Sequence, residues 1–122
     1  MSYTSEDWRN AIANLIQRTS KKSVSWTTSE LFKGDAWTEV DRSFECAVND
    51  KLFVVSETRR KHYLDEDVFV WNGGYDFSVF TGDKYDVALL ASAPNDLHII
   101  GNLFGAAAAN FAHNSNVLGD LL

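Results

Sequence analysis

A helical pattern opens the chain. Apolar side chains follow the i, i+3, i+4, i+7 spacing of one helix face at Trp8, Ala11, Ile12, Leu15 and Ile16. Thr4 or Ser5 can cap the first turn, and two acids follow, where the positive end of the helix dipole favours negative charge. The pattern predicts a surface helix that docks on the rest of the protein through its Trp8 face.

The next segment changes to alternating periodicity. "SVSW", residues 23–26, predicts a short strand, and residues 27–37 look irregular, with one helical turn ending at Gly34. Residues 38–60 predict a hairpin around an Asn49-Asp50 turn, because Asn and Asp tolerate positive φ. The predicted register pairs Cys46 with Phe53, Phe44 with Val55 and Arg42 with Glu57.

Further strand signals follow. "VFVWNGGYDFSVF", residues 68–80, is rich in β-branched and aromatic residues, and its Asn72-Gly73 pair is either a hairpin turn or a bulge in one long strand. "TGDK", residues 81–84, signals a turn before the strand "YDVALLAS", residues 85–92. A three-residue loop there would place Val79 opposite Val87 and Phe77 opposite Leu89.

A second helix is predicted from Asn95 onward. One face carries Leu97, Ile100, Phe104, Ala107 or Ala108, and Phe111. The order is helix, strands, helix. It predicts an α+β fold, a single domain over residues 1–122, with one antiparallel sheet of four to six strands and the N-terminal and C-terminal helices packed on one face.

Composition narrows the class of partner. The 122 residues carry 17 acids against 11 Lys and Arg, a formal net charge of -6. This field repels phosphate backbones and argues against a nucleic-acid partner. It suits a protein that meets a basic partner surface, or one whose charge serves solubility alone.

The ends and the single cysteine bear on location. Acids stand where a signal peptide would have a basic region, and the longest apolar stretch, "FGAAAANFA", is too short to span a bilayer. Cys46 has no partner for an intrachain disulfide. We therefore expect a cytoplasmic protein without a membrane segment.

The stretch "RRKHYLDEDV", residues 59–68, is the segment that most resembles a catalytic or metal-binding site. A metal site there would use His62 with Asp65 or Asp67. However, one His and several loop carboxylates match no specific ligand spacing. The stretch is therefore interpreted as a solvated turn between two strands, with no metal.

Other catalytic arrangements are weaker. Cys46 alternates in phase with Phe44 and Val48, which indicates a core residue rather than a thiolate activated by His62, His98 or His113. The sequence contains no phosphate-binding glycine loop, nucleophile elbow or paired CxxC. No cofactor is expected, and a non-enzymatic protein is favoured over an enzyme.

Acid–base catalysis by a strand carboxylate stays open as the rival. Asp41, Asp76 and Asp86 lie in strand-like sequence, and an inward-facing carboxylate could serve as acid or base. The alternation instead places Asp76 and Asp86 opposite their apolar neighbours, which favours outward-facing side chains.

The aromatic residues are a second feature that bears on function. The set is more than the core of one small domain requires: Trp26, Trp37, Tyr63, Trp71 and Tyr75. Either some of them form a protein-binding patch ringed by acids, or they pack the sheet against its helices.

The layout of elements resembles a group of known proteins. The segments that carry the resemblance are "AIANLIQRTS", "VSW", "YLDEDVFVWNGGYDFSVF" and "VLGDLL". In order and texture they resemble small acidic bacterial α+β proteins of uncharacterised function. In size and charge the chain is similar to immunity proteins, which block a toxin by binding it. The resemblance implies no catalytic residues.

Three functions follow as hypotheses. The preferred one is a non-enzymatic protein-binding domain, an inhibitor or immunity-type protein, that covers a basic protein surface through Tyr63, Asp65, Glu66, Asp67 and Trp71. The second is a small-ligand-binding or isomerase-like domain with a cavity between sheet and helices. The third is a structural domain that oligomerises through a sheet edge or the alanine-rich helix.

Overall fold

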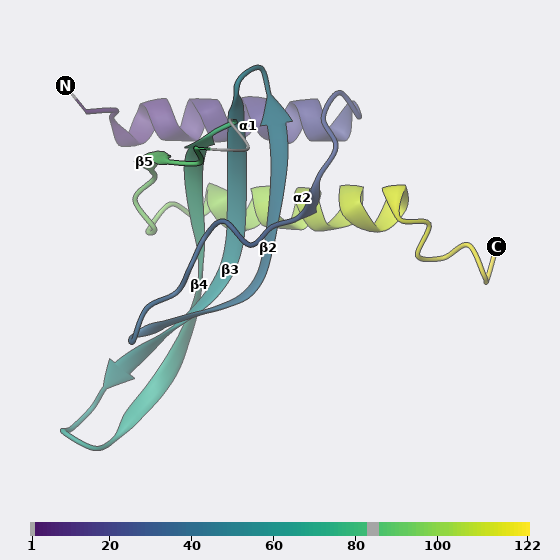
Figure 1. Cartoon of the computed structure of the whole chain (residues 1–122). Coiled ribbons are helices and arrows are strands. Elements are labelled where there is room, and N and C mark those ends of the chain that lie inside the picture. Colours follow the sequence, from purple (N-terminus) through teal and green to yellow (C-terminus); the bar gives the residue numbers. More distant parts are fainter. Residues whose placement is uncertain (1, 83–85) are drawn as a thin grey trace.

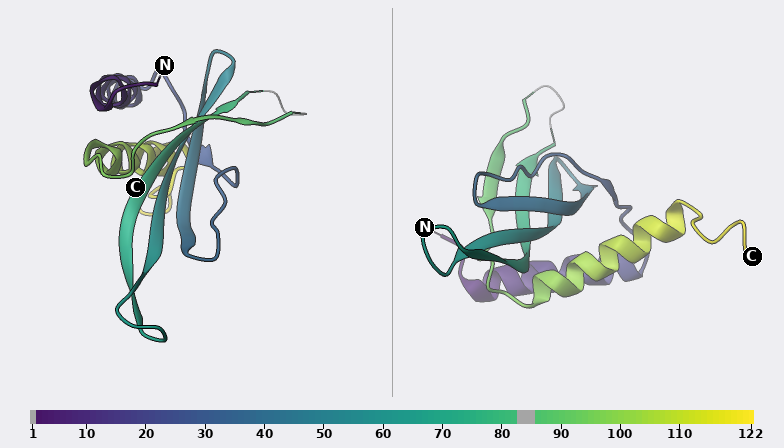
Figure 2. Two further views of the ribbon diagram at one scale, coloured as in Figure 1. Left: turned by 90° about the vertical axis from the view of Figure 1, so that its left-hand side faces the viewer. Right: turned by 90° about the horizontal axis from the view of Figure 1, so that it is seen from below.

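The computed structural model describes residues 2–82 and 86–122 and shows a helix, five strands and a second helix in chain order (Figure 1). The elements are α1 (Ser5–Ser20), β1 (Thr27–Thr28), β2 (Thr38–Val48), β3 (Lys51–Tyr63), β4 (Phe69–Thr81), β5 (Leu89–Ser92) and α2 (Ile99–Asn114). The strands form one antiparallel sheet in chain order, and both helices lie on one face of it (Figure 2). The predicted fold class is confirmed.

The core lies between this sheet face and the two helices. Phe44, Val55 and Phe77 of the sheet meet Ile12 of α1 and Ile100 of α2, and all five side chains are buried. Burying a side chain of this kind stabilises the native state by about 1.5–3 kcal/mol, so this layer supplies most of the drive to fold.

The N-terminal helix begins as the sequence predicts. Thr4 Oγ1 accepts a hydrogen bond from the Asp7 amide, and Asp7 Oδ2 accepts one from the Thr4 amide, both at 3.0 Å. This reciprocal capping satisfies amides that the helix itself leaves free. Of the predicted apolar face, Ala11 is exposed, because it borders an open groove beneath α1.

The C-terminal helix begins later than predicted. Residues 95–98 form turns in which the Ile100 amide donates to the Leu97 carbonyl at 3.2 Å, and α2 starts at Ile99. The predicted apolar face is nonetheless largely buried, at Leu97, Ile100, Phe104 and Ala107.

The hairpin of β2 and β3 has the predicted register. Cys46 pairs with Phe53, Phe44 with Val55 and Arg42 with Glu57, and Asn49 at the turn has a φ of 57°. Among the described residues, however, Arg42 forms no ion pair with Glu57. Its guanidinium lies 5.0 Å from the centroid of the Phe44 ring, which favours a cation over its face.

The segment before this hairpin departs from the prediction. Residues 23–26 form no strand, and the first strand is the two-residue β1, which pairs with Phe44 and Glu45 of β2. No helical turn ends at Gly34 in this described segment. The glycine is needed there because a Cβ would collide with the carbonyl oxygen of Thr38.

Asn72-Gly73 forms neither a turn nor a bulge. Asn72 pairs with Arg60 and Gly73 with Arg59 in an unbroken ladder from Lys51↔Thr81 to Tyr63↔Phe69. Gly73 does not adopt the positive φ that a tight hairpin turn requires. The chain reverses at residues 64–68, within the stretch 59–68 that was predicted as a turn, whereas residues 59–63 of that stretch belong to β3.

The pairing of β4 with β5 also differs from the prediction. Val79 pairs with Ala91 and Phe80 with Leu89, with a register shift between Val79 and Phe80. A loop longer than predicted therefore connects the strands. The predicted "TGDK" turn lies partly at residues 83–84, outside the described residues.

Candidate functional site

The hairpin of β3 and β4 extends beyond the rest of the sheet. The β2–β3 ladder ends at Thr38↔Arg60, whereas the β3–β4 ladder continues to Tyr63↔Phe69. Residues 61–71, here named the arm, project away from both helices (Figure 1). A two-stranded ribbon of this kind has no core of its own and depends on contacts between its side chains.

The tip of the arm is a compact turn. The Leu64 amide donates to the Val68 carbonyl at 2.8 Å, and the Glu66 amide donates to Asp65 Oδ1 at 2.7 Å. These bonds satisfy the backbone locally. The acids Asp65, Glu66 and Asp67 are all exposed at the tip.

An aromatic cluster covers one side of the arm. The ring of Tyr63 meets those of Trp37 and Phe69 with centroids 5.5 and 5.4 Å apart, and Phe69 meets Trp71 at 5.6 Å. Trp37 joins the arm because its carbonyl accepts a hydrogen bond from the Lys61 amide at 2.9 Å. All four residues are exposed to solvent over a large part of their surface: Trp37 by 56%, Tyr63 by 41%, Phe69 by 38% and Trp71 by 36%.

Two cations lie over these rings. The Arg59 guanidinium is 5.0 Å from the Trp71 centroid, and Lys61 Nζ is 4.9 Å from that of Phe69. Arg59 also binds Asp41 at 2.8 Å and Glu39 at 2.7 Å, so carboxylates of β2 balance its charge. The cluster is thereby held in one arrangement by contacts on several sides.

The opposite side of the same strands carries a group of polar side chains. Thr58 Oγ1 donates to Asp76 Oδ2 at 2.7 Å, and Arg60 Nη2 pairs with Asp76 Oδ1 at 2.9 Å. Asp76 does lie opposite its apolar neighbours, as predicted, but it is only 9% exposed rather than solvated. A buried carboxylate requires such partners, and Thr58 and Arg60 supply them.

The residues predicted to contact a partner all lie on the arm. Tyr63 and Trp71 belong to the aromatic cluster, and Asp65, Glu66 and Asp67 form its tip. Whether they touch a partner stays a prediction.

The predicted contact residues omit two members of the cluster, Phe69 and Trp37, although Trp37 was among the aromatics considered for a patch. Phe69 could have been found from the turn, because a reversal at residues 64–68 places it opposite Tyr63. Trp37 carries no comparable local signal. Of the other aromatics considered for a patch, Trp26 is 1% exposed and belongs to the core. Tyr75 is partly buried and packs against this core.

The groups considered for chemistry are dispersed. Burial raises the pKa of the Cys46 thiol to about 12, with a smaller contribution from Glu45, so the thiol stays protonated at neutral pH. His62 pairs with Val70, and Asp86 is exposed. In the part of the chain that the structure describes, no three His, Cys, Asp or Glu side chains gather as metal ligands would.

Comparison with known proteins adds no relative. No family model, curated protein or solved structure matches this chain. Within the described ranges, neither helix has the length and apolarity that a membrane span needs.

Proposed function

We propose that the protein is a non-enzymatic protein-binding domain, an inhibitor or immunity-type protein, that holds a basic surface of its partner with the arm. The observation that carries the proposal is the exposed cluster of Tyr63, Phe69 and Trp71 on a projecting hairpin, with Trp37 packed against it. Trp and Tyr dominate the energetics of protein interfaces, and clustered exposed aromatics are uncommon on a surface without a partner.

The mutual packing of the rings favours tight binding. Each ring already contacts a neighbour, and Arg59 and Lys61 lie against two of them. When a partner covers the cluster, its side chains would therefore lose little conformational entropy, because they are already ordered. The free energy of desolvating the rings would be available for association.

The acids at the tip favour a basic partner. Asp65, Glu66 and Asp67 are consecutive, exposed and carried at the outermost turn of the hairpin. Charges in such a position act before contact is made, so they raise the association rate and make it depend on salt.

The test is affinity capture at low salt from cells that contain the natural partner, followed by mass spectrometry. Three baits are compared: the unmodified chain, Tyr63→Ala with Trp71→Ala, and Tyr3→Ala. Tyr3 is an exposed aromatic of the N-terminal segment and controls for loss of an aromatic ring. We expect the unmodified chain and Tyr3→Ala to capture a stoichiometric basic polypeptide. The variant Tyr63→Ala with Trp71→Ala should recover at least about tenfold less of this polypeptide.

A fourth bait separates the role of the tip. Asp65→Asn, Glu66→Gln and Asp67→Asn together should slow association and weaken its salt dependence while leaving the aromatic contacts in place. Equal recovery of the polypeptide by all baits would contradict the placement of the site on the arm. If only the chain itself is recovered, and the mass of its assembly in solution rises with protein concentration, the oligomerising function would be favoured instead.

A further inference from the structure

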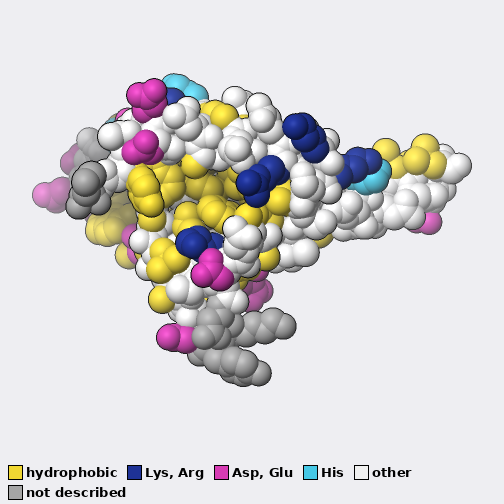
Figure 3. Space-filling model, turned by 90° about the horizontal axis from the view of Figure 1, so that it is seen from above, with side chains coloured by type: hydrophobic (Ala, Val, Ile, Leu, Met, Phe, Trp, Pro, Cys, Tyr) yellow, Lys and Arg dark blue, Asp and Glu magenta, His cyan; other side chains and the backbone are white. Residues whose placement is uncertain are grey.

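The N-terminal helix leaves a groove against the sheet. α1 packs along α2, and it reaches the sheet at Trp8, whose ring meets Phe77 edge-on with centroids 6.0 Å apart. Beside this contact lies a hollow of about 480 Å³, with Ala11 and Leu15 above it and Val48, Phe53 and Phe77 below. Seen from above, hydrophobic side chains gather in this hollow with Lys and Arg beside it (Figure 3).

The groove continues toward the N-terminal end of α1. A second hollow of about 560 Å³ shares Ala11 and Phe53 with the first and is otherwise lined mainly by Trp8, Val79, Leu90 and Ala91. Both hollows lie between a helix and a sheet. The occupant must therefore be slender, because another helix with its side chains is about 10 Å across.

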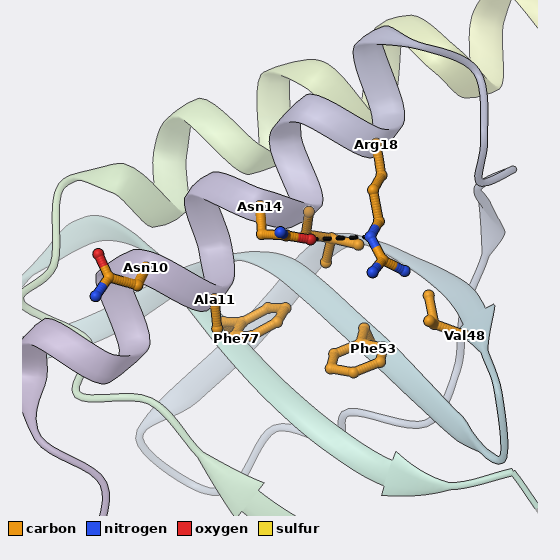
Figure 4. Close-up of a pocket in the computed structure, with 8 residues that line it drawn as sticks. Asn10, Ala11, Asn14, Arg18, Val48, Phe53 and Phe77 are labelled. Atoms are coloured by element: carbon orange, nitrogen blue, oxygen red, sulfur yellow. Dashed lines mark hydrogen bonds between the residues drawn. The ribbon is translucent and has the colours of Figure 1, made fainter.

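One end of the groove carries a positive charge. Arg18, in the last turn of α1, reaches down toward Val48 and Phe53 (Figure 4). Its Nε donates to Asn14 Oδ1 at 2.9 Å, which fixes the guanidinium plane. Among the described residues no carboxylate pairs with Arg18, so its terminal nitrogens are available to an anion.

The other end of the groove, near Trp8, disfavours an anionic group. Asp7 and Lys51 border the second hollow, but Lys51 is already paired with Asp50 at 3.0 Å. A carboxylate placed there would meet the Asp7 charge. The charge pattern therefore sets one orientation, with an anionic group at Arg18 and an apolar chain toward Trp8.

We propose that this groove binds a medium-chain carboxylate, with its carboxylate on Arg18 and its acyl chain along Phe53 and Phe77. Each hollow has the volume of an ordinary small-ligand site, which is about 300–1,000 Å³. The site lies under α1 and uses no residue of the arm, so it is independent of the proposed protein binding.

The test uses decanoate below its micelle concentration and amide chemical shifts of the ¹⁵N-labelled chain. We expect saturable shifts centred on Ala11, Leu15 and Phe53. Arg18→Gln should weaken decanoate about tenfold, because one charge-assisted hydrogen-bond pair is lost, and should leave decanol binding unchanged. Arg9→Gln is the matched control: it removes the same charge about two and a half turns away, on the opposite face of α1.

Each outcome decides the proposal. Saturable binding that Arg18→Gln weakens and Arg9→Gln does not would support it. Equal weakening by the two variants, or none, would overturn the placement of the carboxylate. The absence of saturable shifts with the unmodified chain would overturn the site itself. Because Arg18 is exposed and lies outside the core, its variant should keep the native amide spectrum.

Discussion

The indole of Trp26 donates a hydrogen bond from Nε1 to Thr19 Oγ1 at 2.9 Å. Thr19 donates in turn to the Leu15 carbonyl at 2.8 Å, so a buried chain of two bonds joins residue 26 to α1. The Trp26 amide donates to Asn110 Oδ1 of α2 at 2.9 Å. These bonds explain why Trp26 is buried although its segment forms no strand.

Thr19→Val should lower the free energy of unfolding by about 1–3 kcal/mol. The substitution keeps the shape of the side chain but leaves the indole N–H without an acceptor in the core. Urea denaturation of the two proteins measures the difference. Thr27→Val, at an exposed position of β1, is the control and should change stability by less than about 0.5 kcal/mol. Equal stability of the Thr19 variant and the unmodified chain would contradict the role given to this bond.

Asp76→Asn should destabilise the protein by about 2 kcal/mol. The amide cannot accept from both Thr58 and Arg60 as the carboxylate does, and it removes the charge that Arg60 pairs with. Chemical denaturation at neutral pH is the measurement, with Asp96→Asn at an exposed position as control. If Asp76→Asn were neutral, the polar side of the sheet would not depend on this carboxylate.

Local signals were sufficient for much of the fold. The β2–β3 register follows from the Asn49-Asp50 turn and the alternation on either side of it, both of which act over a few residues. The capping of α1 is likewise local. Each was predicted correctly because the tertiary structure agrees with the local preference.

Prediction failed where distant contacts override local preference. Asn72-Gly73 is a strong turn signal, yet the pairing of Tyr63 with Phe69 and of Val55 with Phe77 keeps it inside a strand. Trp37 lies 26 positions before Tyr63 and meets it only because β2 and β3 are paired. The groove under α1 depends on how far that helix stands from the sheet, which periodicity does not encode.

Cys46 should make stability fall at alkaline pH. Burial raises its pKa from 9.0 to about 12, above that of the unfolded chain, so its contribution is complete below about pH 9 and is lost as the pH rises toward 12. Between pH 8 and pH 10 the unmodified chain should lose about 1 kcal/mol more than Cys46→Ala does. Urea denaturation of both proteins at the two pH values measures this. Parallel losses would show that the thiol ionises equally in both states.

Two glycines of α2 should respond differently to alanine. A Cβ added at Gly105 would meet no atom within 4 Å, so Gly105→Ala should raise the free energy of unfolding by about 0.5–1 kcal/mol through backbone entropy. At Gly101 the Cβ would lie 3.1 Å from Tyr75 Cε2, and the ring would have to move. Gly101→Ala should therefore gain less than Gly105→Ala, or lose stability.

The Tyr75 ring can be tested as the cause of this difference. In a Tyr75→Leu background the obstructing ring atoms are absent, so Gly101→Ala should gain more than it does beside the native tyrosine. Gly105→Ala should gain the same amount in both backgrounds, because Gly105 touches nothing that the substitution changes. Denaturation midpoints of the single and double variants give the coupling free energy. A coupling of zero would mean that α2 already stands far enough from β4 to accept a methyl group at Gly101, and that the close approach of Gly101 to Tyr75 contributes nothing to the choice of glycine.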